Sequence, residues 1–193
     1  QRPHTGEDGR PSTGWHAQFG DVDNDGLSDL FIAKGNVDQM PGLAMADPNN
    51  LLVQLEDGTF VETASVAGVA TTERSRGAAL ADFDLDGRLD LVVVNRRAPI
   101  ELYRNITPAV GHWVALDLRS PAPNTRAIGA LVTLNGQSQQ VVVGGGHAGG
   151  QSGPLHFGLG DVTIAEGQVT WPDGQVTQVK VAADAVHVLG PAP

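Results

Sequence analysis

The chain has 193 residues, of which 22 are acidic and 12 basic, giving a formal net charge of −10, and it has no cysteine. This length allows one domain or two small ones. No cluster of Lys and Arg is present, which argues against a nucleic-acid partner. The missing cysteines exclude disulfides and thiolate metal sites. No apolar run reaches the roughly 18–20 residues that a membrane span needs.

The first part of the chain predicts short strands around an aspartate-rich loop. Residues 1–14 are polar and rich in Gly and Pro, which predicts a tail or loop. The stretches WHAQFG and LFIA then flank the segment DVDNDGLSDL at residues 21–30. LLVQL and TFVETA follow, separated by the turn Glu56-Asp57-Gly58, whose Asp57-Gly58 pair predicts a β-hairpin.

The same order of features returns 61 residues later. RGAALA precedes DFDLDGRLDL at residues 82–91, and LVVV and IELYRN follow it. A period of about 60 residues is typical of one four-stranded propeller blade. Two blades cannot close a ring, so we expect either that further blades precede them in a longer chain or that a partner completes the array.

The pattern changes after Thr107-Pro108. Strand-like runs separated by Gly, Pro and Asn follow, with hairpin signals at Asn135-Gly136 and Asp173-Gly174. We therefore expect an all-β protein, with two propeller-type blades and a C-terminal sandwich-like or partial-barrel β domain. The predicted divisions are a tail at 1–14, the two repeats at 15–108 and the last domain at 109–193.

The two aspartate loops predict two Ca²⁺ sites. Calcium takes 6–8 oxygen ligands, and Asp side chains at alternate positions can converge if the backbone coils tightly at a glycine. An EF-hand would need Glu at the twelfth position, but Ile32 and Val93 stand there. A polar Asp-Gly turn without metal is the simpler alternative. The predicted metal ligands are the carboxylates of Asp21, Asp23, Asp25 and Asp29 with the carbonyl of Leu27, and those of Asp82, Asp84, Asp86 and Asp90 with the carbonyl of Arg88.

The segments GDVDNDGLSDLFIAKGN and ADFDLDGRLDLVVVN resemble FG-GAP (VCBS-type) repeats, the calcium-loop blades of integrin-like propellers. HWVALDLRS, NTRAIGALVTL, HFGLG and WPDGQV resemble the ASPIC/UnbV domain. Together, over about residues 15–180, they resemble the C-terminal part of the cartilage acidic protein group, which has bacterial members. The resemblance implies a calcium-stabilised scaffold for adhesion or assembly that is secreted, on the cell surface or periplasmic.

We therefore expect a non-enzymatic module that binds a protein partner. A calcium-dependent, lectin-like module that binds carbohydrate through its tryptophans is one alternative, and an accessory subunit of a larger surface complex is another. In the lectin-like alternative, sugars would stack on Trp15, Trp113 and Trp171. We expect instead that all three tryptophans pack within the fold.

Three further motifs are weaker. GGGHAG, residues 144–149, matches G-x-G-x-x-G, but a strand-like run follows it where a dinucleotide site needs a helix, so we expect a glycine-rich loop. His147, Ser152, His156 and Asp161 offer hydrolase residue types, but Ser152 lacks a G-x-S-x-G frame. Asn105-Ile106-Thr107 is a formal glycosylation sequon followed directly by Pro108.

Overall fold

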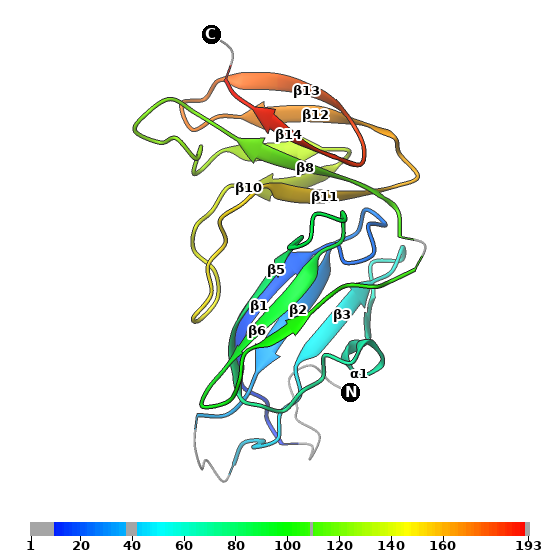
Figure 1. The fold of residues 1–193 in the computed structure, drawn as a ribbon, viewed down its shortest axis with the longest axis vertical. Helices are drawn as coiled ribbons and strands as arrows, with labels where there is room; N and C mark the ends of the chain where they lie inside the picture. Colours follow the sequence, from blue (N-terminus) through cyan, green and yellow to red (C-terminus); the bar gives the residue numbers. More distant parts are fainter. Residues whose placement is uncertain (1–9, 38–41, 109, 192–193) are drawn as a thin grey trace. The chain divides into compact units, whose positions relative to one another are not determined.

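The computed structural model describes residues 10–37, 42–108 and 110–191. Within these ranges the chain forms fourteen β-strands and one short helix, which confirms the predicted all-β class (Figure 1). The helix, α1 (Ala64–Ala67), is a single turn, and among the described residues no helix has the length and apolar character needed to cross a membrane. Most of the predicted tail, residues 1–9, lies outside the described residues, and Gly14 already begins a strand.

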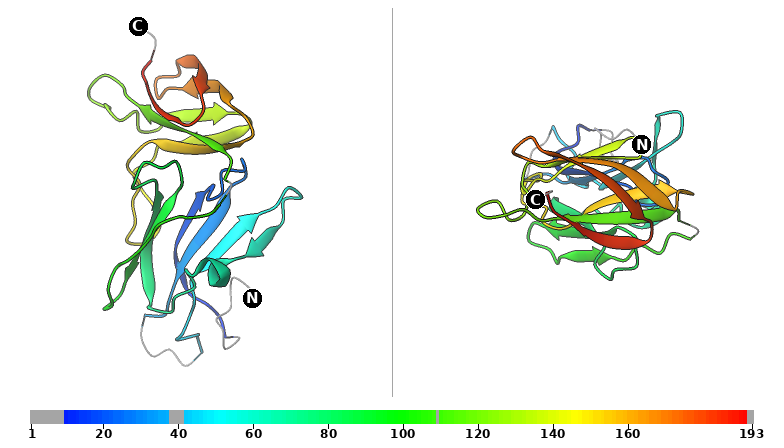
Figure 2. Two further views of the ribbon diagram at one scale, coloured as in Figure 1. Left: turned by 45° about the vertical axis from the view of Figure 1, so that its right-hand side comes forward. Right: turned by 90° about the horizontal axis from the view of Figure 1, so that it is seen from above.

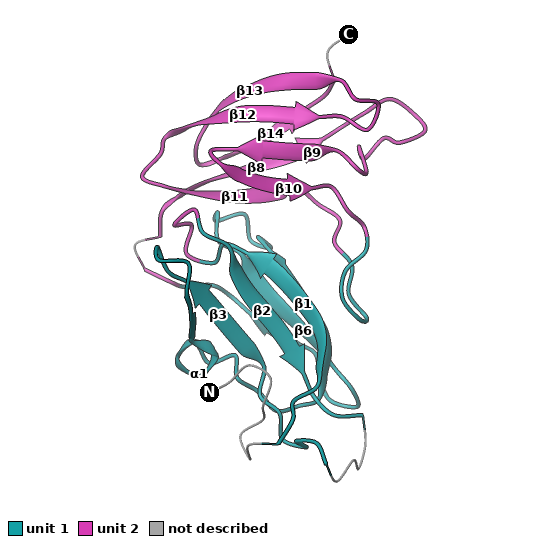
Figure 3. Ribbon diagram, turned by 180° about the vertical axis from the view of Figure 1, so that it is seen from behind, with its two compact units in different colours: residues 1–22, 27–106, 144–150 teal, residues 23–26, 107–143, 151–193 magenta. Residues whose placement is uncertain are grey.

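The described chain divides into two compact units, and each includes a short segment from the other's part of the sequence (Figure 3). The first unit comprises residues up to 22, 27–106 and 144–150. The second comprises 23–26, 107–143 and the residues from 151 onward. The glycine-rich segment and the tip of the first aspartate loop are therefore the two exchanged pieces.

Two antiparallel sheets, one from each repeat, build the first unit (Figures 1 and 2). The first sheet has the order β1-β2-β3-β4, formed by Gly14–Gly20, Asp29–Lys34, Asn50–Gln54 and Phe60–Glu62. The second has the order β5-β6-β7, formed by Ser75–Ala81, Asp90–Asn95 and Glu101–Tyr103. The expectation of four strands in each blade is therefore wrong for the second repeat, because the chain leaves that sheet after β7 and continues into the second unit.

Apolar side chains from both sheets form the core of the first unit. Its buried residues include Phe31 of β2, Leu80 of β5 and Val93 of β6. Both first strands carry a bulge at the same place, where the pairing register shifts around Trp15 and around Arg76. The Arg76 guanidinium lies 4.6 Å from the centre of the Trp15 ring and donates to the carbonyls of Gly35 and Asn36. The two bulges thus hold the repeats together.

The second unit is a two-layered β-sandwich, as predicted. Its core lies between the layers and includes Val114, Val132, Phe157 and Trp171. Asn135 and Gly136 both adopt positive φ in the predicted two-residue hairpin between β9 (Leu131–Leu134) and β10 (Gln137–Gln140). One sheet has the order β10-β9-β12-β13 (Gln137–Gln140, Leu131–Leu134, Ile164–Thr170, Val176–Ala182), and the other has the order β11-β8-β14 (Leu155–Gly160, His112–Leu118, Ala185–Leu189).

Candidate metal centres in the two aspartate loops

The two aspartate loops occupy equivalent places in the two repeats. The first joins β1 to β2, and the second joins β5 to β6. Gly20 pairs with Asp29 across the base of the first loop, and Ala81 pairs with Asp90 across the base of the second. The register of the strands therefore places the same loop positions at the same end of each sheet.

The loop backbones also adopt matching conformations. The fourth residue of each loop has positive φ, 59° at Asn24 and 62° at Leu85, and the sixth is a glycine at 93° in Gly26 and 87° in Gly87. A leucine in this left-handed region is strained, whereas glycine is not. That Leu85 accepts this conformation indicates that the tight coil, and not the local residue preference, determines the loop's shape.

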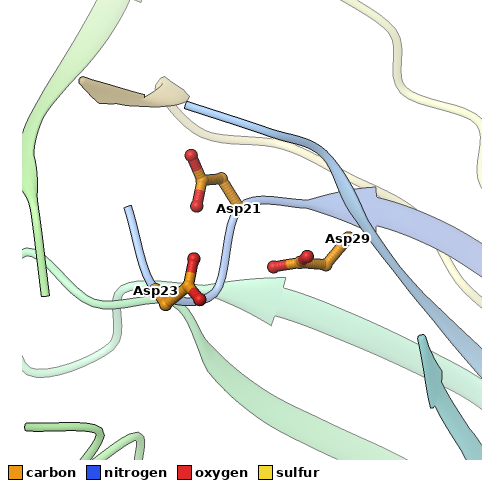
Figure 4. A group of neighbouring side chains, drawn as sticks. All are labelled: Asp21, Asp23 and Asp29. Atoms are coloured by element: carbon orange, nitrogen blue, oxygen red, sulfur yellow. The ribbon is translucent and has the colours of Figure 1, made fainter. Parts of the chain in front are cut away.

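Three carboxylates of the first loop converge on one point. Asp21, Asp23 and Asp29 each offer an oxygen within 4.8 Å of the others, and Figure 4 shows these side chains around a common space. The Asp21 and Asp29 side chains are only 4% and 0% exposed. Carboxylate oxygens are the ligands that Ca²⁺ prefers. A bound Ca²⁺ would also relieve the repulsion between these buried negative charges. Asp25 is exposed and lies outside this group, and Leu27 is half-buried.

The second loop gathers a slightly different set. Asp82, Asp84 and Asp86 form its group, while Asp90 is buried but not a member. The Asp82 carboxylate accepts the amides of Asp86 at 3.1 Å and Gly87 at 2.9 Å. Burial nevertheless raises the pKa of Asp82 above its usual value. These three carboxylates also suit a hard cation.

Arginines surround the second group. Partial burial raises the pKa of Asp86, but the backbone amide and guanidinium of Arg88, together with Arg104, outweigh this effect and lower it overall. Arg88 was expected to act through its carbonyl, and the structure adds an ion pair of 3.0 Å from its Nη1 to Asp86 Oδ2. The sequence pattern does not predict a role for Arg104, which lies fourteen residues after Asp90.

The last aspartate of each loop closes the loop through backbone amides. Asp29 accepts Val22 N at 2.8 Å and Gln54 N at 2.9 Å. Asp90 accepts Phe83 N at 3.1 Å and Asn105 N at 2.8 Å. In both repeats one amide comes from the loop itself; the other comes from the last residue of β3 in the first repeat and from just beyond β7 in the second. These two aspartates therefore have a structural role that does not require a metal.

Asn105 links the two loops. Its side-chain amide donates to the carbonyl of Val22 in the first loop at 2.7 Å and to that of Leu89 in the second at 3.1 Å. The sequence shows this asparagine only as a formal sequon, whereas the structure uses its amide nitrogen within the fold. The signal that could have found it is the alignment of the two repeats. Leu52 and Tyr103 occupy equivalent pairing positions, and Gln54 and Asn105 each lie two residues further on.

The glycine-rich segment 144–150 packs against the rest of the first unit, to which it belongs. The His147 amide donates to the carbonyl of Trp15 at 3.0 Å, and the two rings lie 5.0 Å apart. A Cβ on Gly77 would overlap the carbonyl of Ala148, and one on Gly146 or Gly149 would overlap His16. The glycines thus serve close packing. The next element after them is the strand β11, so the helix of a dinucleotide site does not follow.

His156 belongs to a packed contact in the second unit. Its Nε2 lies 2.9 Å from Oδ1 of Asn24, and its ring stacks on Trp113 with an interplanar angle of 9°. Gly160 N donates to the carbonyl of the same Asn24 at 2.8 Å. Burial lowers the pKa of His156 to about 4. Ser152 and Asp161, the other residues considered for hydrolysis in this unit, are exposed.

The three tryptophans are engaged within the fold. Trp15 contacts both Arg76 and His147, and Trp113 stacks on His156. Trp171 is buried and donates through Nε1 to Thr177 Oγ1 at 2.8 Å. This matches the expectation of packing roles, and it gives the carbohydrate-binding alternative no specific support.

Comparison with known families confirms the resemblance inferred from the sequence. Residues 21–93 match the model of the FG-GAP-like repeat, which spans both aspartate loops. Residues 120–192 match the model named ASPIC and UnbV, which spans most of the second unit.

Several curated proteins are similar to this chain. Cartilage acidic protein 1 of Mus musculus is 30% identical over 126 residues, covering 59% of this chain and 19% of the relative. The Homo sapiens protein of the same name is 31% identical over 126 residues, covering 59% and 18%, respectively. The Xenopus tropicalis protein is 38% identical over 85 residues, covering 44% and 12%. The chain thus spans less than a fifth of the length of these relatives.

Proposed function

The chain combines an FG-GAP-like repeat region with an ASPIC and UnbV region, and we propose that it is a calcium-stabilised binding module that acts outside the cytoplasm, either secreted, on the cell surface or in the periplasm. The observation that carries this proposal is the convergence of three carboxylates in each of two equivalent loops. The similarity to cartilage acidic protein 1 supports the location and the class of module.

In this proposal the first ion is held by Asp21, Asp23 and Asp29, and the second by Asp82, Asp84 and Asp86. A bound Ca²⁺ supplies positive charge and no reaction chemistry, so its effect is to hold each loop in its coiled form. Extracellular modules of this kind bind calcium with dissociation constants of about 10⁻⁴–10⁻³ M. The loops then stabilise the ends of the sheets on which a binding surface is built.

We also propose a protein partner, or a larger complex, and no catalysis. Large apolar side chains are exposed around the second sheet of the first unit, which is a frequent property of contact surfaces. They include Val94, Ile100, Leu102 and Ile106. His156 is the hydrolase candidate whose pKa is shifted. Its ring contacts Asn24 and Trp113, neither of which can act as a nucleophile.

Calorimetric titration of the whole chain with Ca²⁺ tests the metal sites. We expect two binding events, with Asp23→Asn removing one and Asp84→Asn removing the other, because each substitution deletes a charged ligand from one loop. Asp173→Asn is the matched control: it removes the same charge from an exposed turn, where Asp173 accepts the amide of Gln175. Two unchanged binding events in both loop variants would contradict the assignment.

A further inference from the structure

Arg104 lies directly over the second group of carboxylates. It follows β7, and its guanidinium bridges two members of the group: Nε is 2.6 Å from Asp84 Oδ2 and Nη2 is 3.1 Å from Asp86 Oδ2. Arg88 Nη1 contacts the same oxygen of Asp86 at 3.0 Å. Two of the three carboxylates that would hold a cation therefore already bind a positive charge of the chain itself.

These arginines belong to the second repeat alone. In the first sheet Leu30 pairs with Leu52, and in the second sheet Leu91 pairs with Tyr103. The residue after Tyr103 is Arg104, and the residue after Leu52 is Val53. By the same alignment of the loops, Arg88 corresponds to Leu27. The two loops thus share their aspartates but differ at the two positions that supply guanidinium groups in the second.

We infer that Arg104 is a built-in counter-ion that competes with the divalent cation for the second loop. This inference rests on the proposed function, because it assumes that the loop binds a cation. A guanidinium and a metal ion at Asp84 Oδ2 and Asp86 Oδ2 compete for the negative charge of the same oxygens, and the two cations repel each other at this distance. The Arg104 side chain is 63% exposed, so it can move into solvent when the cation binds.

The competition gives the second loop two ordered states. At low calcium Arg104 neutralises Asp84 and Asp86 and keeps the loop closed; at high calcium the ion replaces it. Arg104 is therefore a residue that sets the affinity of the second site without being one of its ligands. The first loop, with Val53 at the corresponding position, provides the substitution that removes the competitor.

The test is a Ca²⁺ titration of the whole chain carrying Asp23→Asn, so that the second site is observed by itself, with and without Arg104→Val. We expect Arg104→Val to tighten binding about tenfold, because it removes one competing charge at close range. Arg119→Val is the matched control. Arg119 is also a half-exposed arginine paired with an aspartate, Asp117, but it lies in the second unit, and its loss should leave the affinity unchanged.

A second measurement follows the arginine itself. In the NMR spectrum of the Asp23→Asn protein, the Arg104 Nε–H signal should move toward the position of a solvent-exposed arginine as Ca²⁺ is added. Equal affinity in the Arg104→Val and parent proteins, with a stationary signal during binding, would overturn the inference and leave the proposed calcium site standing. Absence of binding in both proteins would overturn the inference together with the second calcium site.

Discussion

Asp29→Ala is expected to lower the free energy of unfolding of the first unit by about 3 kcal/mol in chelator, and by more in calcium, where a ligand of the first ion is lost as well. The Asp29 carboxylate is fully buried and accepts the amides of Val22 and Gln54. Removing it leaves two partly buried N–H groups without their charged acceptor, which is among the costly losses in a fold. Denaturant unfolding followed by circular dichroism, with and without a chelator, measures the effect.

Two comparison variants sharpen this result. Asp29→Asn keeps one acceptor oxygen and should cost less than the alanine variant. Asp25→Ala changes an exposed residue of the same loop and should alter stability in chelator by no more than about 0.5 kcal/mol. If Asp29→Ala were as stable as the native protein in chelator and weaker only in calcium, the loop-closing role would be wrong and Asp29 would be a metal ligand alone.

Acid should destabilise the second unit through His156. Burial lowers its pKa to about 4, whereas an unfolded chain has a histidine pKa of about 6.5. Between these values the unfolded state binds more protons, so stability rises with pH in this window. The contribution is fully present above pH 6.5 and is lost as pH falls toward 4, amounting to about 3 kcal/mol.

The measurement is an NMR titration of the His156 ring, with unfolding experiments at pH 7 and pH 4 on the native protein and His156→Gln. Because carboxylates titrate in both proteins, their effect cancels in the comparison. The difference between the pH dependences of the two free energies of unfolding is therefore due to His156. Glutamine retains an N–H that can donate to Asn24. A ring midpoint near 6.5, or identical pH dependence in both proteins, would contradict the buried neutral state.

Spacing alone predicted four carboxylates and a carbonyl in each loop, whereas the structure gathers three carboxylates in each, without Asp25 and Asp90. Spacing could not separate the roles of the aspartates, because their partners come from distant strands. Asp29 and Asp90 are distinguished by the amides of Gln54 and Asn105, which reach them only through strand pairing. The same reason applies to Arg104. The pairing of β7 with β6 brings it to Asp84, although the two residues are far apart in sequence.

Other differences arise where a pattern has more than one structural use. The 60-residue period predicted two four-stranded blades, yet the second sheet ends at β7 because the following residues enter the sandwich. The glycines at 144–150 predicted a glycine-rich loop, and the structure shows what the sequence could not: they allow the backbone to approach His16 and Gly77 closely. The hairpin signals, by contrast, depend on two adjacent residues and were predicted correctly, as at Asn135-Gly136.

Thermal unfolding in millimolar Ca²⁺, in Mg²⁺ and in a chelator tests the central claim most directly. Calcium binds the folded loops, so it should raise the unfolding temperature, with about 2.7 kcal/mol of stabilisation per site at a hundredfold excess over the dissociation constant. Mg²⁺ should have little effect, because it requires a smaller, more regular site. The same unfolding temperature in all three solutions would contradict the calcium sites and leave the aspartates as turn residues.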